Sequence, residues 1–396
     1  MSSIRPVAGE VALRAQYVGE VLDVLYPPPA SGTGLRTEFV VVPNARRPRL
    51  LVPVGSRRVA AAAVRRYAQP AARTARFKRD LAALALRTGV DRALLRDRIV
   101  LTRSASADTF ESYLRRVLDW DVTLSIHIGP ARANRKPVVQ LLSPGGETIG
   151  FAKLGTNPLT RRLVRSETTA LTALRQARLS TVATPRVVHA GRWRGHEVLV
   201  QEALPAWQSR HPAGLRLPAA MREVASCLGL TRTTLSASRY AVTLRAALTA
   251  VNSSELRDAA DGVLTRRGGT ALEFGAWHGD WAPWNMAALA GSLLVWDWER
   301  FTPGVPMGFD ALHHALHVRL ERGKPARAAV SDVVSQAPRL LAPFDVAPDA
   351  ARVTALLYLI DLASRYLIDK QAEAGARLGV LGTWLLPVLI QRLEEL

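Results

Sequence analysis

Carboxylate and amide side chains gather in two neighbouring segments of the sequence. Residues 278–285 read H-G-D-W-A-P-W-N, with Asp280 and Asn285 five positions apart, and residues 295–299 read V-W-D-W-E, with Asp297 at their centre. Oxygen atoms of such side chains are the ligands that hard divalent cations prefer. The two segments therefore predict a site in which carboxylates and an amide hold a cation and one carboxylate accepts a proton.

The stretch between these segments predicts a short β-hairpin. Residues 286–289 and 293–296 are apolar runs on either side of the turn sequence Ala290-Gly291-Ser292. Such a hairpin would carry Asn285 where it starts and Asp297 where it ends. The alternative is a buried strand-turn-strand with polar ends and no chemical role.

The spacing of these residues resembles the catalytic and metal-binding segments of the aminoglycoside phosphotransferase and choline kinase group of small-molecule kinases. The resemblance covers roughly residues 115–390. It implies an α+β, bilobal protein-kinase-like fold, with an antiparallel-sheet N-lobe and a mainly helical C-lobe. It also implies ATP and Mg²⁺ as cofactors.

Roles follow from the same resemblance. Asp280 would be the general base that accepts the proton of the attacking hydroxyl, and Asn285 and Asp297 would be the magnesium ligands. Asp310, near the start of a predicted helix, would brace the catalytic loop from below, although it could equally be a plain helix cap. His278 is expected to support the site structurally.

Upstream segments predict the strands and the helix of an N-lobe. Residues 122–128 alternate apolar and polar side chains, and further strands are predicted at 138–142 and 148–154. Lys153 lies in the last of these strands, where a buried ammonium group needs a partner. Glu167, in a predicted helix over 159–177, can supply it. In the resembled kinases this lysine contacts the ATP phosphates and the glutamate orients it; the alternative is a surface lysine.

Two further nucleotide contacts are expected from position. The basic loop 129–136 takes the place of a phosphate-covering loop but has only Gly129, so Arg132, Arg135 or Lys136 would meet the phosphates or simply face solvent. After a hairpin over 186–201, Glu202 and Ala203 would form the linker between lobes, whose backbone would bind the adenine. We therefore expect an N-terminal α/β extension of unknown role at 1–107, an N-lobe at 108–201 and a C-lobe at 202–396.

The segment after Asp297 favours a small substrate over a protein substrate. Only residues 298–309 separate Asp297 from Asp310, no A-P-E motif follows, and Glu299 replaces the glycine of D-F-G. A protein kinase needs a long activation segment to hold a peptide. The acceptor is therefore expected to be a hydroxyl of a small molecule such as a sugar, an amino alcohol or an antibiotic-like compound.

Composition sets outer limits. The chain has 396 residues, a single cysteine and a formal net charge of +20 at pH 7. Neither a signal peptide nor a membrane-spanning run is recognisable, and we expect a cytoplasmic protein. The positive charge disfavours a polycationic aminoglycoside as substrate. It also raises nucleic-acid binding as a remote alternative, which the lack of any recognisable module disfavours.

Other features are weaker. His313 and His317 lie one helical turn apart, a spacing that can ligate zinc, but no third ligand is near them in the sequence. Trp281 and Trp284 could stack on a substrate, although core packing is favoured. The functional alternative to a phosphotransferase is a catalytically silent kinase-fold protein that binds nucleotide or an anionic partner. The sequence leaves open the acceptor, the choice between ATP and GTP, and the oligomeric state.

Overall fold

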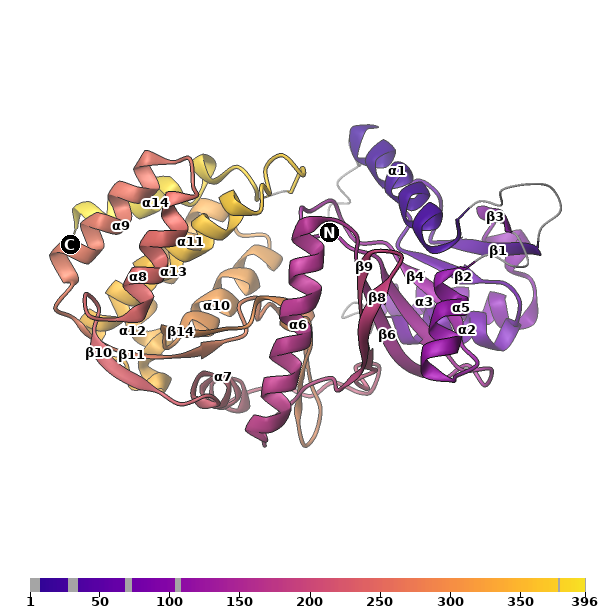
Figure 1. The fold of residues 1–396 in the computed structure, drawn as a ribbon, viewed down its shortest axis with the longest axis horizontal. Helices are drawn as coiled ribbons and strands as arrows, with labels where there is room; N and C mark the ends of the chain where they lie inside the picture. The colour runs from indigo at the N-terminus through magenta and orange to yellow at the C-terminus, as the bar shows by residue number, and fades with distance from the viewer. Residues whose placement is uncertain (1–7, 28–34, 68–72, 104–107, 377, 396) are drawn as a thin grey trace. The chain divides into compact units, whose positions relative to one another are not determined.

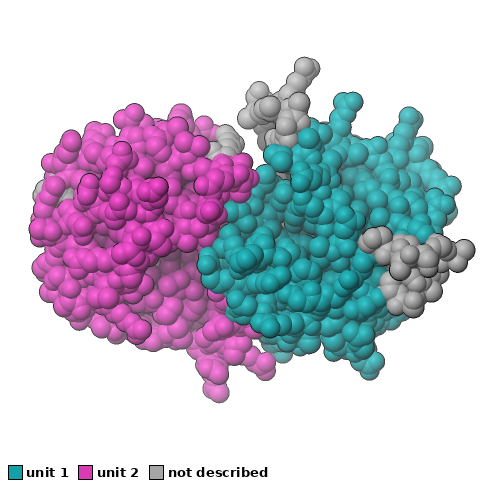
Figure 2. Space-filling model, turned by 45° about the horizontal axis from the view of Figure 1, so that its top comes forward, with its two compact units in different colours: residues 1–165, 185–208 teal, residues 166–184, 209–396 magenta. Residues whose placement is uncertain are grey.

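The computed structural model describes residues 8–27, 35–67, 73–103, 108–376 and 378–395 (Figure 1). The chain divides into two compact units, coloured separately in Figure 2. Unit 1 comprises residues 1–165 and 185–208, and unit 2 comprises residues 166–184 and 209–396. Residues of the expected extension and of the expected N-lobe therefore lie in the same unit.

Unit 1 is built on one antiparallel sheet of eight strands. The strand order is β3-β1-β2-β4-β5-β6-β9-β8. Strands of the expected extension continue the sheet, because β2 pairs with β4. The strands are β1 (Leu35–Val42), β2 (Leu50–Pro53), β3 (Arg98–Arg103), β4 (Thr123–His127), β5 (Val138–Leu142), β6 (Thr148–Gly155), β8 (Val187–Trp193) and β9 (His196–Glu202).

Apolar side chains on the two faces of the sheet belong to two separate hydrophobic cores. In β1, Phe39 and Val41 belong to one cluster, while Val40 between them belongs to the other. Successive side chains of a strand point to opposite faces, so a strand that is apolar at every position requires a helix layer on each face. One cluster includes residues of α1 and α5, and the other includes residues of α2 and α3. The helices of this unit are α1 (Ala8–Leu25), α2 (Arg57–Tyr67), α3 (Arg73–Thr88), α4 (Asp91–Leu94), α5 (Phe110–Leu118) and the first part of α6 (Pro158–Ala177).

Unit 2 is mainly helical. Beyond the second part of α6, its helices are α7 (Arg216–Ser226), α8 (Arg239–Thr249), α9 (Ser254–Arg267), α10 (Phe309–Glu321), α11 (Ala326–Ser335), α12 (Ala337–Leu341), α13 (Pro348–Ile368) and α14 (Leu386–Glu394). Short 3₁₀ segments are η1 (Pro283–Asn285), η2 (Trp298–Arg300), η3 (Ala342–Phe344) and η4 (Leu381–Thr383). The long helix α13 is buried along most of its length and packs against α9, α10 and α12.

Two small sheets accompany these helices. One has the order β10-β11-β14 and the other the order β12-β13-β7. Their strands are β7 (Val182–Ala183), β10 (Thr231–Thr234), β11 (Ala271–Trp277), β12 (Met286–Ala288), β13 (Leu293–Val295) and β14 (Thr302–Pro306). The expected hairpin is β12–β13, and β14 is a strand that the sequence did not predict, just before the helix expected to start near Asp310.

The expected α+β class, with an antiparallel sheet in one part and helices dominating the other, is confirmed. No helix within the described part of the chain combines the length and apolar character required to cross a bilayer.

Candidate active site

The loop that carries Asp280 begins where β11 ends, and glycine shapes its first turn. Gly279 has φ of +83°, in the left-handed region where a Cβ is costly. A Cβ at this position would also meet the backbone oxygen of Arg300 at 2.4 Å. Glycine therefore lets the loop pass against the segment that follows Asp297 before it presents Asp280.

Two side chains from later helices anchor this turn. Asp310, at the second position of α10, accepts hydrogen bonds from the backbone N–H of His278 at 2.7 Å and of Gly279 at 3.2 Å. Arg365 of α13 donates to the carbonyl oxygen of Gly279. Burial raises the pKa of Asp310 to about 7, although the two N–H donors and Arg365 act in the opposite direction. The backbone at Gly279 is thus fixed on both sides.

His278 joins the loop to the end of the β12–β13 hairpin. Its Nδ1 lies 3.1 Å from the backbone nitrogen of Asp280, and its Nε2 lies 3.1 Å from the carbonyl oxygen of Trp296. Burial lowers the pKa of His278 to about 4, so the ring is neutral at neutral pH. We assign the tautomer in which Nδ1 accepts from Asp280 and Nε2–H donates to Trp296, because only this form satisfies both contacts.

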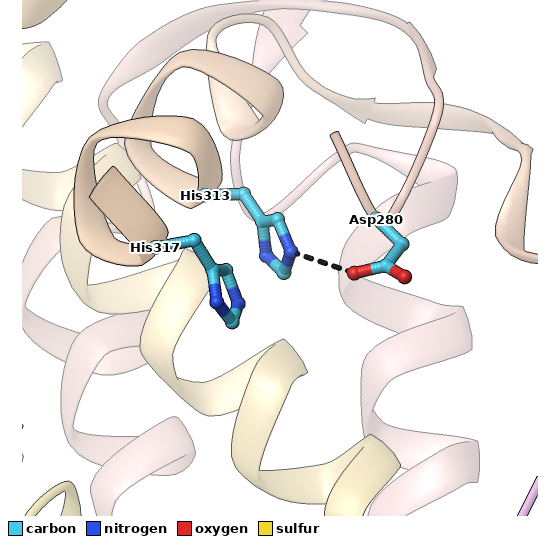
Figure 3. A group of neighbouring side chains, drawn as sticks. All are labelled: Asp280, His313 and His317. Carbon is cyan, nitrogen blue, oxygen red and sulfur yellow. Dashed lines mark hydrogen bonds and ion pairs between the residues drawn. The ribbon is translucent and has the colours of Figure 1, made fainter. Parts of the chain in front are cut away.

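The Asp280 carboxylate is directed by two side-chain donors. Its Oδ1 lies 3.1 Å from Nε2 of His313 (Figure 3), and its Oδ2 accepts from the amide of Asn285 at 2.9 Å. Burial alone would raise the pKa of Asp280. The hydrogen bond to His313, and the positive charges that His317 and Arg365 can carry, outweigh burial and hold this pKa below its usual value. The carboxylate is therefore ionised at neutral pH, with 26% of the side chain still exposed.

Asn285 is positioned by the same loop and by the hairpin. Its amide nitrogen donates to both the backbone oxygen and Oδ2 of Asp280, each at 2.9 Å. The amide oxygen is then the atom that could ligate a cation. Its backbone oxygen accepts from Trp296 N–H at 3.1 Å. The hairpin therefore brings Asn285 beside the residue that precedes Asp297.

Asp297 belongs to a group of three acidic residues. We call Glu167, Asp297 and Glu299 the carboxylate group, because one oxygen from each lies within 4.8 Å of the others. Asp297 adopts the left-handed conformation, with φ of 71°, and Glu167 Oε1 accepts from Trp298 N–H at 3.2 Å. Oxygen donors alone are the ligand set that magnesium takes in proteins, so these side chains fit that ion.

The residues expected to contact nucleotide from the N-lobe lie in unit 1. Lys153 is buried in β6, where its backbone pairs with Val138 of β5 and Leu199 of β9. Glu202 ends β9, and its carboxylate accepts from Arg186 Nε at 2.7 Å; Ala203 follows directly. Lys153 and Glu167 belong to different units, and their pairing stays a prediction, as do the nucleotide contacts.

The cations of the loop 129–136 have different surroundings. Arg135 lies over the ring of Tyr17, with its guanidinium carbon 3.6 Å from the ring centre. Lys136 is buried, whereas Arg132 is exposed. Of the three, Arg132 therefore suits a contact with a bound phosphate best, and Arg135 is used within the unit.

Sequence reasoning missed the residues that surround Asp280. The spacing of His313 and His317 was the one available signal, and it pointed to a metal without a third ligand. Tyr358, whose hydroxyl lies 3.1 Å from Nδ1 of His313, carries no local pattern. Arg365 of α13 contacts the loop that carries Asp280, and this contact depends on long-range packing that no local pattern predicts.

The chain is similar in fold to solved structures of several small-molecule phosphotransferases. No family model and no curated protein matches the sequence. Among solved structures, the chain is similar to an aminoglycoside phosphotransferase in complex with ADP and hygromycin B, with a TM-score of 0.47, 13% identity, and coverage of 72% of this chain and 97% of that one. A macrolide 2'-phosphotransferase from Brachybacterium faecium matches with a TM-score of 0.42, 16% identity, and coverage of 69% and 98%. A choline/ethanolamine kinase family protein from Mesorhizobium loti matches with a TM-score of 0.35, 15% identity, and coverage of 65% and 89%.

Proposed function

We propose that this protein is a phosphotransferase that moves the γ-phosphoryl group of ATP to a hydroxyl group of a small molecule. One observation carries the proposal: the hairpin β12–β13 has the ionised, hydrogen-bonded carboxylate of Asp280 before its first strand, and Asp297 and Glu299 of the carboxylate group after its second. Phosphoryl transfer needs a proton acceptor beside a cluster of oxygen ligands for a divalent cation.

Asp280 is the proton acceptor in this proposal. A carboxylate with a lowered pKa is a weak base, so its first task is to orient the attacking hydroxyl through a hydrogen bond. The hydroxyl becomes acidic as its oxygen bonds to the γ-phosphorus while the bond from that phosphorus to ADP breaks, and the proton then passes to Asp280. The contacts with His313 and Asn285 hold the carboxylate in one direction, which favours this transfer.

The cation and the nucleotide are assigned to the remaining residues. Magnesium, when bound, neutralises charge on the phosphate oxygens. The amide oxygen of Asn285 and the carboxylate of Asp297 would hold it, with Glu299 or Glu167 available as further oxygen donors. Lys153 would contact the phosphates, and the backbone of Glu202 and Ala203 would meet the adenine.

The path of the chain after Asp297 supports a small acceptor. Strand β14 starts two residues after η2 and pairs with β11, so residues 302–306 are committed to a sheet. Helix α10 begins shortly after. A segment long enough to hold a peptide substrate does not fit between Asp297 and α10.

The test is ATP consumption by the purified protein over a panel of hydroxylated metabolites, repeated with Asp280→Asn. The variant should lower kcat by about 10²–10⁴-fold, the range that general-base removal costs. Asp349→Asn is the matched control, because that carboxylate is exposed at the start of α13. Equal activity of native protein and Asp280→Asn would refute the role of Asp280. Nucleotide binding without turnover of any metabolite would favour the catalytically silent alternative.

A further inference from the structure

Three potential zinc ligands meet beside the catalytic loop. His313 and His317 project from the same side of α10, and Figure 3 shows Asp280 opposite them. Their ring centres are 4.4 Å apart. The sequence showed these two histidines but no third ligand near them. In the fold, Asp280 lies beside His313 although it is more than thirty residues away in the sequence. One ligand atom from each of the three residues lies within 4.8 Å of the others.

We propose that Asp280, His313 and His317 form a binding site for Zn²⁺ or a similar borderline transition-metal ion. We call these residues the imidazole group. Two imidazoles and one carboxylate, with a fourth position left for water, is a ligand set that zinc takes in proteins. The site does not depend on the proposed phosphotransferase function.

The geometry requires little movement. Zinc lies about 2.0–2.1 Å from nitrogen and oxygen ligands, which places two tetrahedral ligands roughly 3.3 Å apart. His313 Nε2 and Asp280 Oδ1 are already 3.1 Å apart. His317 must approach by about 1.5 Å at most, because its ligand atom lies within 4.8 Å of the other two. It is a largely buried residue that packs edge-on against the half-exposed ring of Trp284.

Neighbouring groups would orient two of the ligands. The hydroxyl of Tyr358 lies 3.1 Å from Nδ1 of His313, and the amide of Asn285 donates a hydrogen bond to Oδ2 of Asp280. Ligation through Nε2 places the His313 hydrogen on Nδ1, where the Tyr358 oxygen can accept it. Zinc-bound histidines usually donate their other N–H to such a partner, and ligating carboxylates are usually hydrogen-bonded as well.

Donor chemistry separates this ion from magnesium. Imidazole nitrogen suits zinc and neighbouring transition metals, whereas magnesium takes oxygen ligands. The carboxylate group has no nitrogen donor. Zn²⁺ at the imidazole group would occupy the oxygen of Asp280 that faces His313, so it would inhibit phosphotransfer if the proposed function holds.

The experiment is a titration of the untagged protein with Zn²⁺ against a chromophoric chelator, and with Co²⁺ followed by visible absorption. We expect one tight Zn²⁺ per chain and the intense visible bands of four-coordinate Co²⁺. His317→Ala should weaken Zn²⁺ binding by more than about 100-fold and remove the bands, because a direct ligand should matter more than the outer partners, whose loss costs 10–100-fold.

His314→Ala is the matched control. This neighbour lies on the same helix but contacts the backbone oxygen of Trp281 at 3.2 Å, and it should bind Zn²⁺ as the native protein does. Asp297→Asn should also keep the site. Native-like binding by His317→Ala, equal loss in His314→Ala, or no saturable binding by the native chain would each overturn the proposal. Failure of the phosphotransferase assay would leave this result unaffected.

Discussion

The imidazole group and the carboxylate group flank one hairpin yet differ in their donor atoms. The residues of the first group offer two imidazoles and one carboxylate, and those of the second offer three carboxylates. Both oxygens of the Asp280 carboxylate also accept hydrogen bonds, one from Asn285 just before the hairpin and one from His313 of α10. Asp297 follows the hairpin in the left-handed conformation and lies near two buried glutamates, Glu167 and Glu299.

This difference assigns separate tasks to carboxylates that are close in the sequence. The imidazoles beside Asp280 add nitrogen donors, which suit a transition metal better than a hard cation, so Asp280 is suited to a proton or to a transition metal. The carboxylate group has the oxygen-only character that magnesium requires. The hairpin thus separates Asp280, the proposed proton acceptor, from Asp297 and Glu299, the carboxylates proposed to hold magnesium, although β12 and β13 each contain only three residues.

Asp297→Asn gives the sharpest separation of the two groups. Removing one charge from the carboxylate group should lower kcat/KM at a fixed Mg²⁺ concentration by at least about 100-fold, and more Mg²⁺ should restore part of it. The Mg²⁺ dependence of ATP consumption measures this effect. Zn²⁺ affinity at the imidazole group should stay unchanged. Parallel loss of both metals would show that the two groups act as one site.

Gly279→Ala tests whether the two groups share a scaffold. A Cβ here would strain the backbone and collide with Arg300, which follows Glu299, so we expect a loss of about 2–4 kcal/mol in the free energy of unfolding. Gly304→Ala is the matched control, because Gly304 also has positive φ but open space around its Cβ position. It should cost only the backbone strain, about 1 kcal/mol. Urea denaturation measures both, and equal losses would show that contact with Arg300 is unimportant.

Local patterns in the sequence predicted most elements of the large sheet and the hairpin. Strands at 138–142 and 148–154 and the helix at 159–177 agree closely with β5, β6 and α6, because alternation and periodicity are local signals. Strand β14 was missed, since Pro303, Gly304 and Pro306 indicate a turn. These residues form an edge strand instead, and an edge position tolerates proline.

The candidate site was predictable only where its residues are close in sequence. Asp280 and Asn285 lie in one loop, five residues apart, and this spacing could be recognised in the sequence. The contacts of His313 with Asp280 and Tyr358 join segments thirty-three and forty-five positions apart. Such contacts depend on how α10 and α13 pack, and this packing is set by many apolar residues together. The continuation of the sheet into β1–β3 was missed for the same reason, because strand pairing between β2 and β4 is a long-range choice.

Asp310→Asn tests how the ionisation of Asp310 affects the stability of the fold. The pKa of Asp310 in the folded protein is raised to about 7, so its neutral form stabilises the fold fully below the unfolded value of 3.8, and this contribution is lost as pH rises through 7. The asparagine variant cannot ionise. Relative to native protein, it should therefore gain in free energy of unfolding between pH 4 and pH 8, by a few kcal/mol at most. Urea denaturation at several pH values measures this difference. A difference that does not change with pH would show that Asp310 is ionised throughout.

His313→Leu and His313→Gln form a matched pair that alters the imidazole group and leaves the carboxylate group intact. Leucine removes the donor that lowers the pKa of Asp280, so this pKa should rise and the acid limb of the kcat/KM profile should move to higher pH. Activity at neutral pH should fall about tenfold, the smaller end of what loss of an orienting partner costs. Glutamine can donate from a similar position and should recover part of the activity and of the acid limb. The Mg²⁺ requirement should be the same in both variants, because neither touches Asp297. An acid limb that stays in place in His313→Leu would mean that the proton acceptor is not controlled by His313.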